Sequence, residues 1–229
     1  MILRSLLLVV PGPALVRAAV SGADALIIDT DGLDDAALRE ISAFVASRTV
    51  PAVFVRVGPV SAARTTDVLD ALVPAHPAGV ILSGSTSGAD VTRLAALMRP
   101  REAMAGIHDG TTRIIAMATD TPASVLALAT YAGASPRLMA LAWDDAPLAQ
   151  ALGAEDMTGT VPSLRTGTLM AAAAAGLAAF DRPFGGSAVS LAREADAARR
   201  AGFAGKLVVS ADQVGIINAA FSRPTGSSS

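Results

Sequence analysis

Short apolar runs alternate with longer, alanine-rich stretches along the whole chain. Most of the runs are apolar at nearly every position, which is typical of strands buried on both faces of a parallel sheet. The stretches between them have the length and spacing of helices, so the pattern predicts strand–helix units that repeat from one end of the chain to the other. We interpret eight runs as strands: Ser5–Val10, Ala25–Ile28, Ala52–Val57, Gly79–Leu82, Arg113–Ala118, Leu138–Trp143, Leu177–Phe180 and Leu207–Val209.

The predicted helices have recognisable starts and stops. In Ala36–Ser47 the apolar residues recur at three- and four-residue steps, and Asp34 or Asp35 precedes them as a candidate N-cap. Ser190–Ala201 stops at Gly202, a residue type that commonly ends helices. Strand–helix units in this number favour a closed α/β fold, a single (β/α)8 TIM barrel, over an open doubly wound sheet.

One domain accounts for almost the whole chain. Its 229 residues are slightly fewer than the ~250 typical of such a barrel. Because no shift in composition marks a domain boundary, we assign residues 1–221 to one TIM-barrel domain. The polar end, residues 222–229 (SRPTGSSS), is predicted to be a disordered tail.

The first apolar run has to be distinguished from a secretory signal. Leu6–Val10 ends at Pro11 and is shorter than the about 7–15 residues of a signal core. No segment reaches the ~20 apolar residues that span a bilayer. We therefore expect this run to form the first strand, and the protein to be cytoplasmic without membrane contact.

The amino-acid composition limits the partners and the catalytic groups that the protein can have. A formal net charge of −2 gives no basic field, so we expect no nucleic-acid partner. Because the chain has no cysteine, thiolate nucleophiles and cysteine metal sites are excluded. The only lysine, Lys206, and the two histidines, His76 and His108, precede predicted strands, on the rim opposite to barrel active sites. The sequence thus predicts no Schiff-base lysine, and leaves carboxylates, arginines, hydroxyls, amides and a metal ion.

Polar side chains gather just after the predicted strands, where barrel active sites lie. Two interpretations stay open, because Asp favours the helix N-caps on that rim and carboxylate oxygens are also the ligands that Mg²⁺ prefers. A bound Mg²⁺ could polarise the carbonyl of a keto acid. The residues are Asp29, Asp31, Arg56, Ser83, Ser85, Asp120, Asp144, Asp145, Asp181, Ser210 and Asp212.

Several segments, in order along nearly the whole chain, resemble one known family. Leu3–Gly12 is similar to its R-S-x-L-F-V-P-G start, Ala23–Asp29 to its A-D-x-x-x-x-D strand, and Ala201–Lys206 to its G-F-x-G-K segment. Further similar positions are Val55–Val57, Arg165, Ala171–Gly176, Ala179–Asp181, Gln213, Asn218 and Phe221. The chain is identified as a divergent member of the citrate lyase β-subunit-like, HpcH/HpaI aldolase-like family of carbon–carbon lyases.

The resemblance implies a homo-oligomeric (β/α)8 barrel that cleaves or forms carbon–carbon bonds in acyl-CoA compounds or keto acids. The family holds Mg²⁺ with a Glu after strand five and an Asp after strand six. The first position is Asp120 here, and the second falls on Pro147, with Asp144 and Asp145 nearby. The resemblance therefore makes Asp120, Asp144 and Asp145 the expected ligands of a weakly bound Mg²⁺.

Other site residues are expected on the same ground. Arg56, Asp29 and Asp31 are the expected catalytic residues. Arg4, Arg56 and Arg165 are the expected substrate-binding residues, since these arginines match family positions.

Several mouth positions depart from the family pattern. Its D-L-E-D acids become Asp29–Gly32, its strand-four P-K becomes Ser83-Gly84, and the His of its I-H-P-x-Q becomes Ser210. Two hypotheses follow. One is a Mg²⁺-assisted, aldolase-type carbon–carbon lyase with a degenerate active site, acting on an acyl-CoA or keto acid. The other is a catalytically inactive barrel that binds a small carboxylate or a partner protein through the retained arginines.

Overall fold

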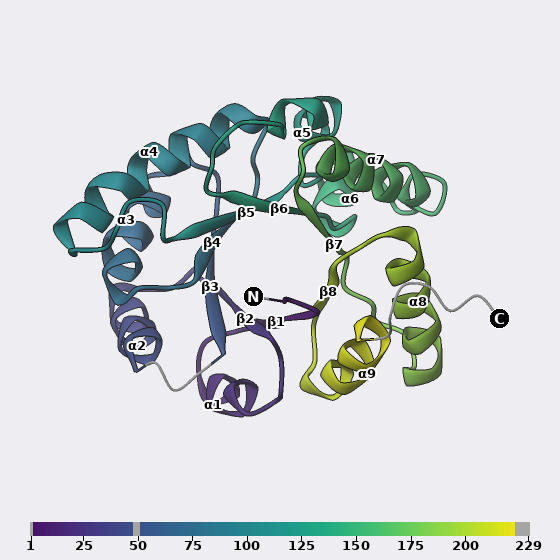
Figure 1. Ribbon diagram of the computed structural model, residues 1–229, viewed down its shortest axis with the longest axis horizontal. Coiled ribbons are helices and arrows are strands. Elements are labelled where there is room, and N and C mark those ends of the chain that lie inside the picture. The colour runs from purple at the N-terminus through teal and green to yellow at the C-terminus, as the bar shows by residue number, and fades with distance from the viewer. Residues whose placement is uncertain (1, 48–50, 223–229) are drawn as a thin grey trace.

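The computed structural model describes residues 2–47 and 51–222. Its eight parallel strands close into a barrel, in which each strand pairs with the next and the last pairs with the first (Figure 1). The predicted (β/α)8 barrel is confirmed. The strands are β1 (Ser5–Val9), β2 (Ala25–Asp29), β3 (Ala52–Val57), β4 (Gly79–Leu82), β5 (Arg113–Met117), β6 (Leu138–Ala142), β7 (Ala178–Asp181) and β8 (Gly205–Val208).

The helices form a ring around the barrel (Figure 1). Two predicted helix ends are confirmed: Asp34 accepts the N–H of Ala37 at 2.8 Å, and Gly202 ends α8 in the left-handed conformation. The helices are α1 (Pro13–Ala19), α2 (Asp35–Ala46), α3 (Ala63–Leu72), α4 (Gly88–Met104), α5 (Pro122–Leu126), α6 (Ala146–Leu152), α7 (Val161–Ala174), α8 (Ala188–Ala201) and α9 (Ala211–Phe221), with 3-10 turns η1 (Val73–Ala75) and η2 (Leu128–Tyr131).

Apolar side chains cover both faces of the barrel wall. One core lies inside the barrel and contains the rings of Phe54 and Phe180. The other lies between the strands and the helices and contains Trp143 and Tyr131. Because consecutive residues of a strand point to opposite faces, a strand with a core on each side needs apolar residues at every position. This explains the unbroken apolar runs of the sequence.

Asp181 and Lys206 lie elsewhere than the sequence suggested. Asp181 is the last residue of β7 rather than the first after it, and Lys206 belongs to β8 rather than preceding it. The strands pair these two residues, and their fully buried side chains form an ion pair of 2.9 Å. Since the neighbouring Phe180 and Leu207 fill the barrel interior, Asp181 and Lys206 point outward, between the wall and the helices.

The other expectations for the chain concern its surface and its end. His76 and His108 are exposed and precede β4 and β5, as predicted. Ser222 caps α9, and the rest of the predicted disordered tail, residues 223–229, lies outside the described residues. Within the described ranges, the structure contains no helix with the length and apolar character needed to span a bilayer.

A buried ion pair holds the end of the barrel opposite to the carboxyl ends of the strands. Arg137, before β6, contacts both carboxylate oxygens of Glu102 on α4, at 2.8 and 2.6 Å. Burial alone raises the pKa of Glu102, but hydrogen bonds from Arg137 and from the N–H groups of Thr112 and Gly110 outweigh it and lower the pKa to about 2. This network ties α4 to the loops before β5 and β6.

Removal of one partner of this pair is expected to be costly. Arg137→Met leaves the Glu102 carboxylate buried without its cation, so the free energy of unfolding at pH 7 should fall by about 3–5 kcal/mol. Urea unfolding measures this change. Because the folded-state pKa of Glu102 lies below its ordinary 4.5, the difference between the two proteins should shrink as the pH falls from 4.5 toward 2.

Candidate active site

The carboxyl ends of the parallel strands form one rim of the barrel, which we call the barrel mouth. β2 ends at Asp29, β3 carries Arg56 next to its last residue, and Ser83 follows β4. Asp120 and Asp144 come shortly after β5 and β6. Consecutive strands thus bring one cation, one hydroxyl and three carboxylates to the rim where barrel enzymes carry their active sites.

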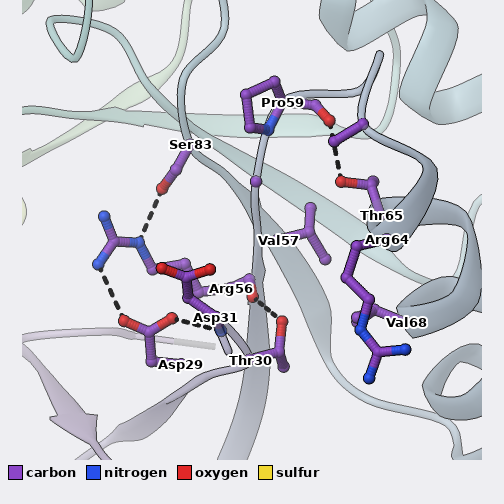
Figure 2. A pocket seen from close by; sticks show the side chains of 12 residues that line it. Asp29, Thr30, Asp31, Arg56, Val57, Pro59, Arg64, Thr65, Val68 and Ser83 are labelled. Atoms are coloured by element: carbon purple, nitrogen blue, oxygen red, sulfur yellow. Dashed lines mark hydrogen bonds and ion pairs between the residues drawn. The ribbon is translucent and has the colours of Figure 1, made fainter. Parts of the chain in front are cut away.

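Arg56 is held in a fixed direction at the edge of a pocket of about 260 Å³. Its Nε donates to the Ser83 hydroxyl at 2.8 Å, and its Nη1 lies 3.3 Å from a carboxylate oxygen of Asp29 (Figure 2). The backbone N–H of Asp31 donates to the other Asp29 oxygen at 3.2 Å, and Asp31 also lines the pocket. Within the described residues Nη2 of Arg56 makes no hydrogen bond, so it is free for an anion.

Asp120 is almost fully buried and only half satisfied. One carboxylate oxygen accepts the backbone N–H of Gly84 at 3.0 Å. The other, Oδ1, is buried and has no hydrogen-bond partner among the described residues. Gly84 has a φ of 64°, and a Cβ there would lie 2.8 Å from Pro59 Cγ, so glycine is required for this contact.

Burial also changes the charge state of Asp120. Burial, with a smaller contribution from the nearby Asp144 carboxylate, raises the pKa of this carboxyl to about 6, although the Gly84 N–H, Arg56 and the Ser83 hydroxyl lower it in part. A buried carboxylate oxygen without a partner is costly unless something else binds it. Asp120 therefore has the properties of a group that lacks a cationic ligand.

Asp144 faces the same region from β6. Its side chain lines a small cavity of about 20 Å³ inside the barrel together with Arg56, Met117 and Leu207. Burial raises its pKa, and the adjacent Asp145 contributes to this rise. Asp145 itself turns toward Arg182 and forms an ion pair there. Of the expected metal ligands, the structure therefore brings Asp120 and Asp144 together beside Arg56, and directs Asp145 elsewhere.

Two of the expected substrate-binding arginines lie away from this site. Arg4 precedes β1, at the opposite end of the barrel, and is paired with Asp24 at 2.7 Å. Arg165 belongs to α7, where its Nε lies 3.4 Å from Asp181 and its guanidinium stacks over the Phe203 ring. Neither lines the pocket or the cavity that contains Arg56.

The family model of the HpcH/HpaI aldolase/citrate lyase proteins matches residues 11–211 of the chain. The chain belongs to this family. A search of curated protein sequences gave no match.

Several solved structures have the same fold as this chain, and a citrate lyase β subunit is among them. RipC from Yersinia pestis is 24% identical, with a TM-score of 0.75 over 97% of this chain and 96% of its own. The citrate lyase β subunit of Mycobacterium tuberculosis, complexed with oxaloacetate and magnesium, is 23% identical, with a TM-score of 0.77 over 97% and 98%. CitE of the same organism, in complex with magnesium, acetoacetate and coenzyme A, is 21% identical, with a TM-score of 0.78 over 98% and 82%. At these identities the likeness concerns the fold.

The family resemblance implies a Mg²⁺ ion at the barrel mouth. Among the described residues no group of three or more His, Cys, Asp or Glu side chains is arranged around one point. Mg²⁺ in proteins commonly keeps several waters and takes only one or two carboxylates, with substrate oxygens completing the octahedron. The pair Asp120 and Asp144, with its unpartnered Oδ1, fits this mode of binding.

Sequence reasoning missed the role of Gly84. From the sequence alone, Gly84 indicates only that the lysine of the family pattern is absent here. In the structure the Gly84 N–H is the group that fixes Asp120. A glycine two residues after a strand was the available signal, since glycine allows the close approach of a backbone amide.

Proposed function

We propose that the protein is a metal-assisted carbon–carbon lyase for a small keto acid or its acyl-CoA counterpart. The observation that carries this proposal is the convergence of Asp120, Asp144 and Arg56 at the barrel mouth, with Asp120 Oδ1 left without a partner. Membership of the family and the magnesium and carboxylate ligands named for the M. tuberculosis structures support it.

The two carboxylates are assigned to the metal. The Asp144 carboxylate makes ionisation of the buried Asp120 carboxyl more costly, because the two acidic groups face one region. Asp120 and Asp144 would hold a divalent cation, which would offset this repulsion and give the free Oδ1 of Asp120 a partner. When bound, Mg²⁺ supplies Lewis-acid polarisation of the substrate carbonyl.

Arg56 is assigned to the substrate carboxylate. A guanidinium binds a carboxylate with charge-assisted hydrogen bonds, and the Ser83 and Asp29 contacts fix the direction of its planar fork. Since one η nitrogen is free, an anion can bind without breaking the existing pair. The 260 Å³ pocket beside Arg56 has room for a small organic acid.

Asp29 and Asp31 are assigned to proton transfer. In the cleavage direction, one of these carboxylates takes the proton of the substrate hydroxyl while the carbon–carbon bond breaks and a new carbonyl forms. The bond electrons pass to the fragment that carries the activating carbonyl, which then takes up a proton. Both carboxylates line the pocket, within reach of solvent. We also propose that the enzyme is cytoplasmic and forms a homo-oligomer. Light scattering of the purified protein would measure its oligomeric state.

The direct test is calorimetric titration with MgCl₂ and MnCl₂ at pH 8, followed by turnover assays. The assays use a panel of keto acids and CoA esters with the metal present and with EDTA. Binding in the micromolar to millimolar range and EDTA-sensitive cleavage are expected. Absence of both metal binding and turnover would overturn the proposal.

Metal affinity is expected to depend on pH around 6. Asp120, whose pKa is about 6, has to lose its proton before it coordinates, so a proton competes with the metal below that value. Between pH 8 and 7 the dissociation constant should stay nearly constant, and below pH 6 it should rise by roughly tenfold per pH unit. Titrations in matched buffers from pH 5 to 8 measure this; an affinity independent of pH over that range contradicts the role of Asp120.

A second candidate, a non-catalytic barrel that binds a small carboxylate or a partner protein, is favoured by one observation. The Ser83 and Asp29 side chains hold Arg56 in an open pocket, and these contacts do not involve a metal ligand of the proposed site. This function predicts that oxaloacetate or acetoacetate raises the melting temperature equally with and without EDTA. The lyase proposal predicts that EDTA abolishes most of the shift.

A further inference from the structure

The residues on either side of Asp144 are both held in place by side-chain contacts. Trp143, Asp144 and Asp145 follow β6, and their side chains diverge. Trp143 is fully buried in the core between the wall and the helices, whereas Asp144 lines the cavity inside the barrel. The backbone direction at Asp144 therefore depends on the contacts that hold Trp143 and Asp145.

A buried carboxylate fixes Trp143. The indole Nε1–H donates to Asp181 Oδ1 at 2.9 Å, and both side chains are fully buried. Lys206 Nζ donates to the other Asp181 oxygen at 2.9 Å and lies 3.7 Å from Glu194. A hydrogen bond to an ionised acceptor in the interior is strong and costly to break, so the indole has one favoured position.

Arg182 holds Asp145, the residue on the other side of Asp144. Its guanidinium lies 5.5 Å from the centre of the Trp143 ring, over the ring, and it forms an ion pair with Asp145. Arg182 directly follows Asp181, so β7 and the residue after it hold both flanks of Asp144. These contacts fix the backbone direction at Asp144, and the Ala146 N–H, which donates to Asp144 Oδ1 at 3.2 Å, holds the side chain itself.

We propose that Trp143 and Asp181 are positioning residues, which direct Asp144 into the barrel mouth through the buried indole–carboxylate hydrogen bond. The family register places its second metal acid at Pro147, which has no ligand atom in its side chain. The hydrogen bond from Trp143, directly after β6, to Asp181 at the end of β7 would instead direct the Asp144 carboxylate toward Asp120. This inference rests on the proposed function, because that function assigns metal binding to Asp144. The metal affinity and the position of Asp144 therefore have to be measured separately.

The test uses the fact that Trp143 is the only tryptophan of the chain. Trp143→Phe removes the donor, and replacement of Trp143 by 3-benzothienylalanine removes the same donor while it keeps the size of the ring. Both proteins are titrated with MnCl₂ at pH 8. Outer partners of metal ligands typically change affinity by roughly 10–100-fold, so we expect a loss of about tenfold in each.

A stability-matched control separates positioning from general destabilisation. Arg137→Met breaks a buried ion pair at the other end of the barrel and should lower the melting temperature at least as much, yet leave the Mn²⁺ affinity of the folded protein within about twofold. If Arg137→Met weakens Mn²⁺ binding as much as the Trp143 replacements do, the effect is one of stability and the inference is overturned.

Crystal structures of the metal-free proteins give the second readout. The inference expects Asp144 to leave the cavity lined by Arg56 and Met117 when the indole donor is removed, and to stay there in Arg137→Met. If wild type binds no metal but Asp144 moves as expected, the proposed function fails and the positioning role stands. If wild type binds metal and the Trp143 proteins bind it equally with Asp144 in place, the positioning role fails and the proposed function stands.

Discussion

Replacement of Asp120 by Asn is expected to abolish divalent-metal binding and, in the same protein, to increase the free energy of unfolding at pH 8. The folded-state pKa of Asp120 is about 6, above its ordinary 3.8, so the folded protein resists ionisation of this group. The corresponding stability is complete below pH 3.8 and is lost as the pH rises through 6. A shift of about two pKa units corresponds to about 3 kcal/mol. Asn carries no charge, and its amide oxygen can still accept the Gly84 N–H, so a gain of about 2 kcal/mol is expected.

Urea unfolding at pH 4 and pH 8, together with Mn²⁺ titration, measures both halves of this result. The increase in the free energy of unfolding of Asp120→Asn over wild type should be large at pH 8 and nearly absent at pH 4. Asp67→Asn, which removes one exposed carboxylate from α3, is the control for the change in net charge and should alter stability by less than about 0.5 kcal/mol. A less stable Asp120→Asn protein that still binds Mn²⁺ would contradict the site as we describe it.

Loss of Arg56 should have the largest effect on turnover. Arg56→Met removes charge-assisted hydrogen bonds to the substrate carboxylate, which we expect to lower kcat/KM by about 10³-fold, or about 4 kcal/mol. Arg56→Lys keeps the charge but not the planar fork, and should recover only part of this loss. Steady-state kinetics on the best keto acid of the panel, at saturating Mg²⁺, provide the measurement.

Arg64 is the matched control for Arg56, because it is another arginine that lines the pocket. Its side chain is engaged by Asp35 at 3.0 Å and by the Leu33 carbonyl, and it reaches away from Asp29 and Ser83 (Figure 2). Arg64→Met should change kcat/KM by less than about fivefold. Equal losses in the Arg56 and Arg64 variants would show that the pocket needs positive charge rather than one oriented guanidinium.

The sequence was a good guide to the fold because of the two-sided burial of the strands. Strands β3 and β4 coincide with predicted runs, and the others differ by one or two residues at one or both ends. The N-cap Asp34 and the helix-ending Gly202 were predictable because their local hydrogen bonding depends on neighbouring residues only. Asp120 and Asp144 were predicted at the mouth for a similar reason, since each follows an unmistakable strand.

The direction of a side chain at a strand end was not predictable. A small shift in the strand boundary moves a residue from the rim into the barrel wall, as Asp181 and Lys206 show. Resemblance to the family does not by itself place Arg4 and Arg165, because an arginine that matches a family position can form a structural ion pair as well as bind a substrate. Their partners, Asp24 and Asp181, become evident only in three dimensions.

The small cavity below Asp144 has a consequence for the order of events in a reaction cycle. Its 20 Å³ admits about one water molecule, so the barrel axis offers no exit toward the far rim. If the proposed cleavage takes place at the mouth, both fragments have to leave through the mouth, and the inner fragment can leave only after the outer one. We then expect the inner product to be a competitive inhibitor and the outer product not to be one.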